Sequence, residues 1–340
     1  MNKPQPRTTR LHKPKRSVSI IGTGSYVPEK ILTNAALEKI VDTSDEWIVT
    51  RTGIKERRMA AADESTGDMA AKAARAALER AGVTAQELDM IIVGTITPDM
   101  AFPNTACVVQ KQIGATKAVC FDLSAACSGF LYGMEIAQQF ISSRACNTIL
   151  IIASDKLTNI TNWTDRNTCV LFGDGAGAAV LQHRPGSHGI IHTVLGANGE
   201  HDEILHMPGG GSRLPLTKEN IGQRLNTIHM NGKEVYKHAV TVMVNAAHEA
   251  LEMAGLQTKD LACIIPHQAN LRIIEAVGSR LGLGPERVFC NLQRYGNTSG
   301  AAVAIALDEA ARTGRMQRDD YILMVVFGGG LTWASSIIQW

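Results

Sequence analysis

The 340-residue sequence lacks the patterns that would indicate a metal centre, a membrane span or a secreted protein. Its seven cysteines are never closer than seven residues apart, so none forms the C-x-x-C pair typical of a zinc site. No apolar run approaches the roughly 18 residues of a transmembrane helix. An odd number of cysteines without a signal peptide favours reduced thiols in a cytoplasmic protein. We therefore expect a cytoplasmic location, with no metal and no membrane contact.

A strong excess of charge of one sign is also missing, since the formal net charge is only +2. Residues 1–16 hold six basic residues and no acidic one, which leaves 28 basic and 32 acidic residues in the remainder. A mildly acidic body argues against nucleic-acid binding. We predict that residues 1–16 form a disordered basic extension, and a targeting or interaction arm is the alternative.

What the sequence does contain is enough apolar material for a large core, at 45% apolar and 19% charged residues. The length suggests two units. Three segments of the first half recur in the same order in the second half: 77–82 with 250–255, 119–123 with 290–292, and 148–153 with 321–327. This order predicts a duplicated α/β unit with largely parallel sheets, divided into halves 17–185 and 186–340.

Cys127 lies among small residues between a predicted strand at 119–123 and a predicted helix at about 127–143. A cysteine at a helix N-terminus meets free N–H groups and the positive end of the helix dipole, both of which favour the thiolate. Cys127 is therefore a candidate nucleophile. The alternative is a buried structural thiol.

Two further candidates follow predicted strands of the second half. His267 comes directly after a buried strand, and Asn297 lies at a strand-to-helix turn. The alternatives are a core histidine and a helix N-cap. Glycines 328–330 could let backbone N–H groups approach an oxyanion, or could form a simple turn. The glycines at 173–177 lack the phosphate-loop pattern and are interpreted as a tight structural turn. Residues 198–225 are predicted to form a long irregular loop.

Five motifs together resemble the β-ketoacyl-acyl-carrier-protein synthase III family of the thiolase superfamily, over about residues 17–340. They are Ser-Asp-Glu-Trp-Ile-Val-Thr-Arg-Thr-Gly-Ile at 44–54, Ala-Ala-Cys-Ser-Gly at 125–129, His-Gln-Ala-Asn at 267–270, Tyr-Gly-Asn-Thr-Ser-Gly at 295–300 and Phe-Gly-Gly-Gly-Leu-Thr-Trp at 327–333. The resemblance implies a duplicated thiolase-like fold, layered α-β-α-β-α, and a homodimer.

The same resemblance implies a reaction at Cys127 that needs no cofactor beyond the CoA thioester substrate. A primer acyl-CoA acylates Cys127, and malonyl-acyl carrier protein then enters. His267 and Asn297 hold the malonyl thioester oxygen during decarboxylation, and the N–H groups of Cys127 and Gly329 hold a second oxyanion. Phe327 stands where biosynthetic thiolases place a second cysteine, and Asn297 stands where elongating synthases place a second histidine.

The resemblance also assigns binding residues one by one. Trp47 and Arg166 are expected to stack on the adenine of CoA. The implied set comprises Thr43, Trp47, Arg51, Arg166 and Asn270 for CoA; Lys237, Arg272 and Arg280 for acyl carrier protein; and Ile228 and Phe102 for the acyl pocket, with Phe102 reaching the pocket of the neighbouring subunit. For the surface charges, an ordinary solvated side chain is the alternative.

We therefore expect an acyltransferase that condenses an acyl-CoA primer, predicted to be acetyl-CoA, with malonyl-acyl carrier protein. The product would be 3-oxoacyl-acyl carrier protein, which starts fatty-acid synthesis. One alternative is a related synthase of specialised metabolism with another acyl donor or extender. A non-catalytic homologue is the other, but it would be expected to lack Cys127, His267 or Asn297, and all three are present.

Overall fold

The computed structural model describes residues 17–186 and 188–340, so the extension predicted for residues 1–16 lies outside the described residues. The first sheet has the order β1-β7-β6-β4-β5. In that order the strands are Val18–Tyr26, Asp174–His183, Thr148–Lys156, Met90–Gly94 and Val119–Leu123. β4 pairs in parallel with β5 and β6, whereas β7 runs antiparallel to β1 and β6.

The second sheet has the order β11-β12-β13-β8, formed by Leu261–Pro266, Tyr321–Gly328, Thr332–Gln339 and Gly189–Ala197. Only β11 and β12 are parallel in it. Both sheets are therefore mixed, and the prediction of largely parallel sheets is wrong. The error has a physical reason, because a buried strand is apolar in either direction and its sequence does not reveal which way it runs.

The strand order of the first sheet repeats in the second, with β8, β13, β12 and β11 in the places of β1, β7, β6 and β4. The helices α3 (Thr66–Ala81) and α6 (Gly232–Ala254) end at Gly82 and Gly255, both in the left-handed region at φ 63° and 71°. The predicted counterpart of β5 at 290–292 is not a strand. That region makes only an isolated parallel bridge, between Ile264 and Val288.

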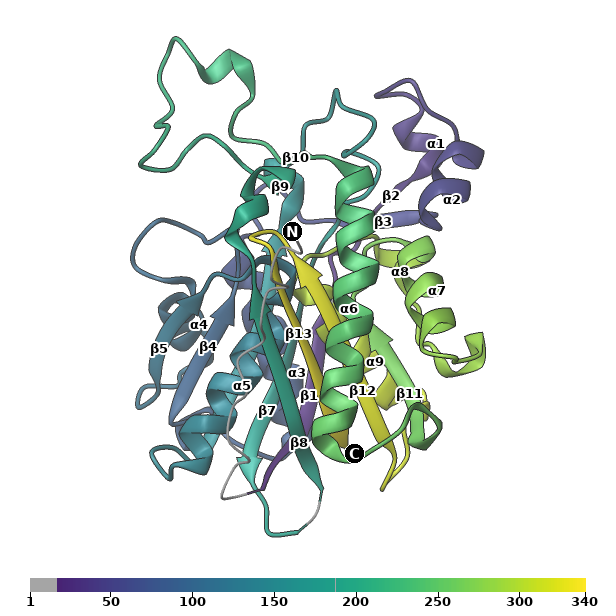
Figure 1. Cartoon of the computed structure of the whole chain (residues 1–340). Helices are drawn as coiled ribbons and strands as arrows, with labels where there is room; N and C mark the ends of the chain where they lie inside the picture. Colours follow the sequence, from purple (N-terminus) through teal and green to yellow (C-terminus); the bar gives the residue numbers. More distant parts are fainter. Residues whose placement is uncertain (1–16, 187) are drawn as a thin grey trace.

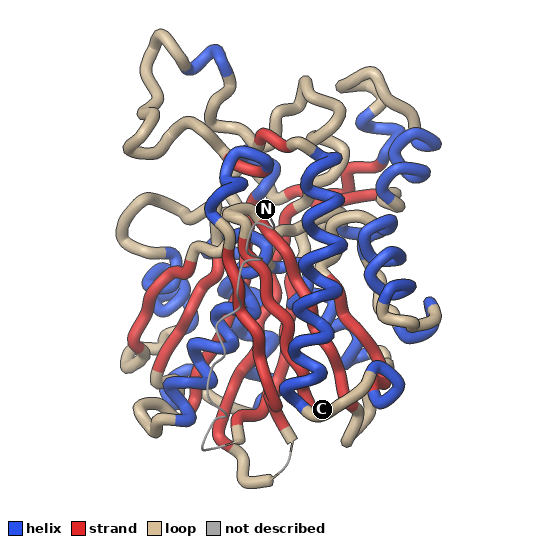
Figure 2. Tube along the Cα trace, viewed as in Figure 1, coloured by secondary structure: helices blue, strands red, loops and turns tan. Residues whose placement is uncertain are grey.

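Helices cover both sheets and fill the space between them, which confirms the layered thiolase-like fold (Figures 1 and 2). α5 (Gly129–Ser142) and α9 (Ala301–Arg312) lie in the middle layer, α3 and α4 (Thr105–Ile113) outside the first sheet, and α6 outside the second, with α7 (Leu271–Arg280) beside it against β11. The inner face of α5 is apolar at helical spacing, through Phe130, Leu131, Met134, Ala137 and Ile141.

The remaining elements are short and lie toward one end of the molecule, at the top of Figure 1. They are β2 (Lys30–Thr33), α1 (Asn34–Leu37), α2 (Asp45–Thr52), β3 (Glu56–Met59), β9 (Leu205–His206), β10 (His229–Met230) and α8 (Leu292–Tyr295). The predicted irregular loop at 198–225 contains two 3-10 turns and β9.

The glycines at 173–177 do not form the predicted tight turn. They lead into β7 and let α9 pack closely on it, because a Cβ added at Gly177 would lie 2.5 Å from the Cβ of Ala304. A Cβ at Gly173 would likewise lie 2.5 Å from the carbonyl oxygen of Tyr295. These glycines thus serve a close approach between the two halves, as glycines in strands often do.

Polar contacts also join the halves and fix the segment between β3 and α3. Asp308 of α9 is fully buried and accepts hydrogen bonds from Thr23, Ser25, Arg80 and Arg312.

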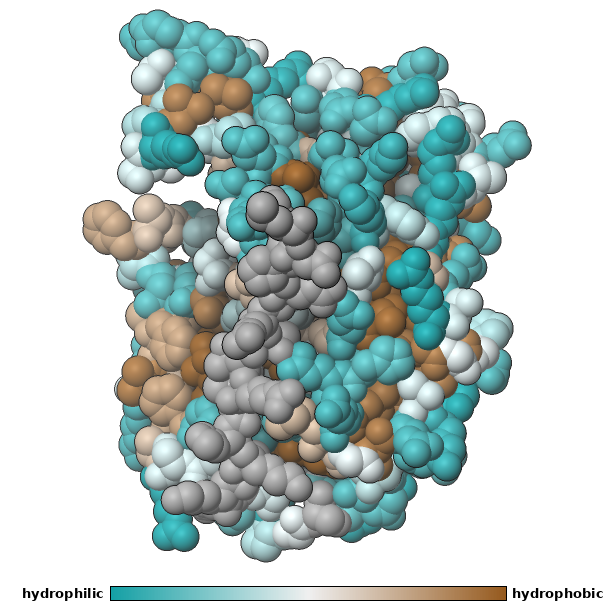
Figure 3. All heavy atoms as spheres, in the orientation of Figure 1, coloured by the Kyte–Doolittle hydropathy of each residue, from teal (hydrophilic) through white to brown (hydrophobic). Residues whose placement is uncertain are grey.

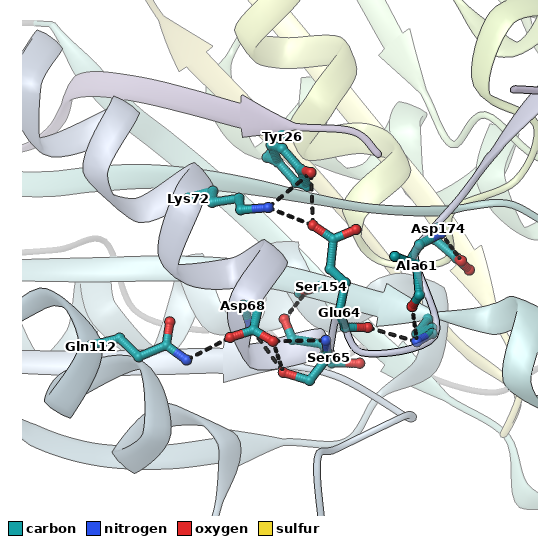
Figure 4. Close-up of polar contacts among 12 residues, drawn as sticks. Tyr26, Ala61, Glu64, Ser65, Asp68, Lys72, Gln112, Ser154 and Asp174 are labelled. Atoms are coloured by element: carbon teal, nitrogen blue, oxygen red, sulfur yellow. Dashed lines mark hydrogen bonds and ion pairs between the residues drawn. The ribbon is translucent and has the colours of Figure 1, made fainter. Parts of the chain in front are cut away.

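Figure 4 shows a second network, in which Tyr26 and Lys72 donate to Glu64 at 2.7 and 2.6 Å, and Ser65 caps α3 through Asp68.

Candidate active site

A cavity of about 1200 Å³ is lined by residues from both halves of the chain. Cys127 enters it from the first half, and His267, Asn297 and Gly329 enter it from the second. Of the other predicted site residues, Trp47, Arg51, Ile228, Asn270 and Arg272 also line it. The cavity lining does not include Thr43, Phe102, Arg166, Lys237 or Arg280.

Cys127 is held in a short 3-10 turn, Ala126–Ser128, between β5 and α5. The end of β12 packs directly on this turn, since a Cβ added at Gly328 would lie 2.7 Å from the Cys127 nitrogen. The Oγ1 of Thr332 donates to the Ala125 carbonyl oxygen at 2.9 Å. A turn of the second half therefore clamps the cysteine of the first half, and Gly328 is needed because no side chain fits there.

Burial raises the pKa of the Cys127 thiol to about 12, and the nearby carboxyl of Asp155 acts in the same direction. Contacts with Ser299 and with the Cys127 backbone N–H lower the pKa, but by less. Burial thus outweighs the preference for thiolate expected from the helix N-terminus. Without substrate the side chain is a neutral thiol at pH 7.

His267 directly follows β11, and its backbone N–H donates to the Val325 carbonyl oxygen at 2.8 Å. Burial lowers the pKa of its imidazole to about 4, so the ring is uncharged at neutral pH. Its Nδ1 atom has no hydrogen-bond partner among the described residues. A neutral imidazole can donate one hydrogen bond to a ligand without carrying a positive charge.

Asn297 presents its amide N–H₂ group rather than its oxygen. The oxygen accepts a hydrogen bond from the Ser299 backbone N–H at 2.9 Å, and because a backbone N–H can only donate, this contact identifies the oxygen. The Asn297 backbone N–H donates to Leu171 of the first half at 2.9 Å. Asn297 is not an N-cap, because Gly300 occupies that position of α9.

The three glycines after Phe327 are more than a turn. A Cβ added at Gly329 would lie 2.8 Å from the Leu205 carbonyl oxygen, so only glycine fits between that segment and the cavity. Gly329 lines the cavity with Cys127, and the neighbouring Gly328 packs against the Cys127 backbone. Because both residues line the cavity, the backbone N–H groups of Cys127 and Gly329 are candidate oxyanion donors.

Trp47, on α2, makes cation–π contacts with two arginines. The guanidinium carbons of Arg51 and Arg166 lie 4.5 and 4.7 Å from its ring centroid. Arg166 also donates to the Asp42 carbonyl oxygen at 2.8 Å. An aromatic base does not fit between Trp47 and Arg166 at that spacing, so adenine stacking there requires Arg166 to move. Next to this site, Thr43 has a buried hydroxyl without a partner among the described residues.

The other predicted CoA and carrier-protein residues have structural contacts of their own. The Asn270 carboxamide caps α7 by accepting from the Arg272 N–H at 2.9 Å, and it donates to the Arg51 carbonyl oxygen at 3.0 Å. The Arg272 guanidinium donates to the Thr50 carbonyl oxygen at 2.9 Å. Lys237 is exposed on α6, 3.7 Å from Glu234, and Arg280 is exposed at the end of α7.

Ile228 belongs to a small apolar cluster beside the cavity, whereas Phe102 does not. Phe102 is 84% exposed in the loop before α4. Sequence reasoning missed the other cavity-lining members of that cluster, which come from four separate segments: Ile96, Leu157, Ile160, Leu171, Phe172 and Leu205. Isolated apolar residues carry no local signal for a pocket, because the same residue types fill any core.

Within residues 17–186 and 188–340, no three histidine, cysteine or acidic side chains are grouped so that they could hold a metal ion. No helix in that part of the chain is both long and apolar enough to span a bilayer.

Two family models match the chain. Residues 121–199 match 3-oxoacyl-[acyl-carrier-protein] synthase III, and residues 251–340 match the C-terminal part of the same family. A β-ketoacyl-[acyl-carrier-protein] synthase III of Caldanaerobacter subterraneus subsp. tengcongensis is 56% identical over 326 residues, which cover 96% of this chain and 98% of that protein.

Solved structures agree. The 3-oxoacyl-[acyl-carrier-protein] synthase III of Aquifex aeolicus VF5 is 47% identical, with a TM-score of 0.89 over 95% of this chain and all of that one. The priming β-ketosynthase of the R1128 polyketide biosynthetic pathway is 38% identical, with a TM-score of 0.88 over 96% of this chain and 98% of that one.

Proposed function

Because the chain belongs to the 3-oxoacyl-[acyl-carrier-protein] synthase III family, we propose that it is the acyltransferase that starts fatty-acid synthesis. It condenses an acyl-CoA primer with malonyl-acyl carrier protein to give 3-oxoacyl-acyl carrier protein, CoA and CO₂. The observation that carries this proposal is the meeting of Cys127, His267 and Asn297, from opposite halves, in one cavity. CoA and the carrier protein are substrates here, and the site residues call for no cofactor.

The first half-reaction transfers the acyl group to Cys127. Its sulfur attacks the thioester carbonyl of the primer, a bond forms from that carbon to Cys127 Sγ, and the bond to the CoA sulfur breaks. The proton lost by the Cys127 thiol leaves on CoA. The N–H groups of Cys127 and Gly329 stabilise the negative oxygen that develops during the attack.

The second half-reaction forms the carbon–carbon bond. The malonyl thioester loses CO₂, and the electron pair of the broken carbon–carbon bond stays on the thioester as an enolate. The enolate oxygen would accept hydrogen bonds from His267 and from the Asn297 amide. The lowered pKa of His267 suits this task, because it keeps the imidazole neutral. A neutral imidazole can donate a hydrogen bond to the enolate oxygen and keep its proton. The enolate carbon then attacks the acyl-Cys127 carbonyl, the carbon–sulfur bond breaks, and the released Cys127 thiolate takes up a proton from water.

Substrate binding is proposed from charge and position. Trp47, Arg51, Arg166, Thr43 and Asn270 would hold CoA near the mouth of the cavity. The basic residues Lys237, Arg272 and Arg280 would meet the acidic carrier protein, because steering charges must remain accessible and Lys237 and Arg280 are exposed.

The primer is proposed to be acetyl-CoA, with its acyl group directed toward the apolar cluster of Ile228 and Phe172. Use of another acyl donor in specialised metabolism is the second candidate. This candidate is supported by the structural similarity to the priming β-ketosynthase of a polyketide pathway, which shows that the same fold is also used in specialised metabolism.

Acylation of Cys127 tests the proposal directly. The protein is mixed with a panel of acyl-CoAs, and intact mass is measured before and after malonyl-acyl carrier protein is added. We expect the mass of one acyl group, mapped to the Cys127 peptide and discharged by the malonyl substrate. The Cys127→Ser variant should form no stable thioester, whereas Cys263→Ser, which alters a buried cysteine outside the cavity lining, should acylate normally. Full acylation of Cys127→Ser would refute the proposed nucleophile.

A further inference from the structure

The glutamine of the His-Gln-Ala-Asn motif, Gln268, is 1% exposed, and all of its hydrogen-bonding capacity is in use. Its Nε2 group donates to the carbonyl oxygens of Pro266 and Phe289, at 2.7 and 3.2 Å. Its Oε1 atom accepts from the backbone N–H groups of Asn291 and Leu292, at 3.0 and 3.2 Å. A carboxamide has two N–H donors and two acceptor lone pairs, so no capacity remains for a ligand.

The four partners of Gln268 are all main-chain groups, which fixes the orientation of its carboxamide. A backbone N–H group can only donate and a carbonyl oxygen can only accept, so the oxygen and nitrogen of this side chain cannot exchange places. Gln268 therefore joins two separate backbone segments, the end of β11 and residues 289–292.

The second of these segments is the start of α8. A helix leaves its first N–H groups without partners inside the helix, and the side chain of the N-cap residue usually accepts from one of them. The N-cap of α8, Asn291, makes no such bond, and its side chain instead donates to Glu309 of α9 at 2.8 Å. Gln268 takes over this capping role, from a position 23 residues earlier in the chain.

α8 leads directly to Asn297. The helix ends at Tyr295, and the N–H group of Gly296 donates back to the Leu292 carbonyl oxygen at 2.8 Å. A Cβ added at Gly296 would lie 2.7 Å from the Leu171 carbonyl oxygen, and the same oxygen accepts from the Asn297 N–H at 2.9 Å. The path from the capped end of α8 to Asn297 is thus short and closely packed, so a shift of α8 would move the Asn297 amide.

We propose that Gln268 is a positioning residue that sets the distance between His267 and Asn297, the two proposed donors to the enolate oxygen. It follows His267 directly in the chain, and it caps the helix that ends just before Asn297. It contacts no reacting atom and moves no proton. This inference rests on the proposed function and extends it, because the roles of the two donors do not by themselves explain what holds them together.

Gln268 should affect only one of the two half-reactions. Decarboxylation needs two donors aimed at one oxygen, and a displacement of about 1 Å at a reacting centre can cost about 10²-fold in rate. Acyl transfer is proposed to use Cys127 and the backbone N–H group of Gly329, and neither residue is bonded to Gln268.

The first test is Gln268→Glu, which keeps the shape and the acceptor oxygen but loses both donors when ionised. Burial and the two facing carbonyl oxygens should raise the pKa of the introduced carboxyl to about 8. We expect CO₂ release by preformed acyl-enzyme to be slower than in the parent by roughly 10- to 100-fold at about pH 8.5. The rate should recover partly toward about pH 6.5, as the carboxyl gains a proton and donates again. Single-turnover acylation of Cys127 should match the parent at each pH.

Gln138→Glu is the matched control. Gln138 is also 1% exposed and also donates to a carbonyl oxygen, that of Ile190 at 3.2 Å, but it lies on α5 outside the cavity lining. This variant should unfold at a lower temperature without a change in the ratio of CO₂ release to acylation. A parental ratio in Gln268→Glu at about pH 8.5 would overturn the positioning role, and so would the same fall of the ratio in Gln138→Glu.

Gln268→Met gives a measurement that does not depend on activity. Its side chain is similar in length but apolar, so it leaves the N–H groups of Asn291 and Leu292 without their acceptor. Hydrogen exchange followed by mass should become faster in the peptide that contains α8 and stay unchanged in α9. CO₂ release should fall as in Gln268→Glu, but without recovery at low pH. Unchanged exchange in α8 would overturn the capping role.

Failure of the proposed function would give a different result. The parent protein itself would then release no CO₂ from malonyl-acyl carrier protein and would carry no acyl group on Cys127. Hydrogen exchange in Gln268→Met would still decide whether Gln268 holds α8. If Gln268→Met does not fold, the pH dependence of CO₂ release in Gln268→Glu decides the question alone.

Discussion

At the scale of single residues, the two central side chains are both neutral at rest. The Cys127 pKa is raised to about 12 and the His267 pKa is lowered to about 4, each mainly by burial. An ion pair between them is therefore not the resting state. The neutral pair suits two separate tasks, acyl transfer at sulfur and hydrogen-bond donation to an enolate oxygen.

The two half-reactions should separate in variants of the donor residues. Removal of one oxyanion donor costs about 10²–10³ in rate in a well-studied hydrolase. His267→Ala and Asn297→Ala should therefore still form acyl-enzyme but release CO₂ more slowly by a similar factor. The measurement is ¹⁴CO₂ release from labelled malonyl-acyl carrier protein, run beside acyl-enzyme mass. Decarboxylation at the parent rate in Asn297→Ala, combined with failed acylation, would assign Asn297 to the primer step instead.

The half-reactions should also differ in pH dependence. Below a pKa of about 12, the thiolate fraction of Cys127 grows tenfold per pH unit, so single-turnover acylation should rise between about pH 6 and 8. His267, with a pKa of about 4, stays neutral across that range, so CO₂ release by preformed acyl-enzyme should be nearly flat. Both profiles are obtained by measuring the rate of Cys127 acylation and the rate of CO₂ release separately at each pH. A fall in CO₂ release below about pH 6.5 would mean that His267 titrates normally.

The sequence was sufficient to predict the residues that lie in recognisable motifs. Cys127, His267, Asn297 and Gly329 do line one cavity. It did not reveal that Gly328 packs against the Cys127 nitrogen. This contact joins the two halves of the chain, and no local sequence pattern encodes such a contact.

At the scale of elements, the periodic segments were predictable and the strand directions were not. The strand predicted at 119–123 is β5, and the helix predicted at about 127–143 corresponds to α5. Residues 173–177 were predicted to form a tight turn because they are rich in glycine. In the structure Gly175 and Gly177 belong to β7 and leave room for α9, and this contact depends on the neighbouring helix rather than on the local sequence.

The buried carboxylate of α9 should be important for stability. Asp308→Ala removes the acceptor of Thr23, Ser25, Arg80 and Arg312, but both arginine side chains are more than 40% exposed and can turn to water. We therefore expect a loss of about 2 kcal/mol in the free energy of unfolding, below the value for a fully buried pair. Urea unfolding measures it.

The control for this prediction is Asp319→Asn, which changes an aspartate whose side chain is 66% exposed beside His188. Its effect should stay within about 0.5 kcal/mol, as for most surface changes. An equally small effect of Asp308→Ala would show that the buried cluster does not hold α9 to β1 and α3.

At the scale of the whole molecule, the duplicated architecture was predictable because the repeated segments occur in the same order. Each half contributes to the cavity, the proposed nucleophile Cys127 from the first and the proposed enolate donors His267 and Asn297 from the second. The sequence contains no comparable pattern that predicts the association of two chains. This association was inferred from the resemblance, and in the structure it has indirect support from an apolar sheet edge.

We expect a homodimer formed along β5. This strand is the edge of the first sheet, Val119 on it is 61% exposed, and hydrophobic surface gathers over β5 and α4 on the left flank of Figure 3. An exposed apolar edge strand is a template for pairing with another chain. Light scattering at micromolar concentration should give the mass of two chains of 36.6 kDa each. A monomeric mass with full activity would contradict this prediction.

Phe102 allows a finer test of the same dimer. Phe102→Ala should keep the dimer mass and broaden the range of acyl-CoAs that label Cys127, because the side chain would close the partner's acyl pocket. Ile40→Ala, which removes another exposed apolar side chain outside β5 and α4, should change neither property. Unchanged acyl selectivity in Phe102→Ala would remove Phe102 from the pocket.

The contact of Trp47 with two arginines has a consequence for turnover. Spent CoA must depart before the carrier protein can deliver its malonyl group, so tight retention of the nucleotide would stall the cycle. Arg166, resting 4.7 Å from the Trp47 ring, competes with adenine for the same aromatic face. A cation–π contact of this exposed kind is worth about 0.5–1 kcal/mol, so it weakens nucleotide affinity roughly two- to fivefold. The proposed stacking of adenine between Trp47 and Arg166 therefore has a small opening cost, which favours release of CoA.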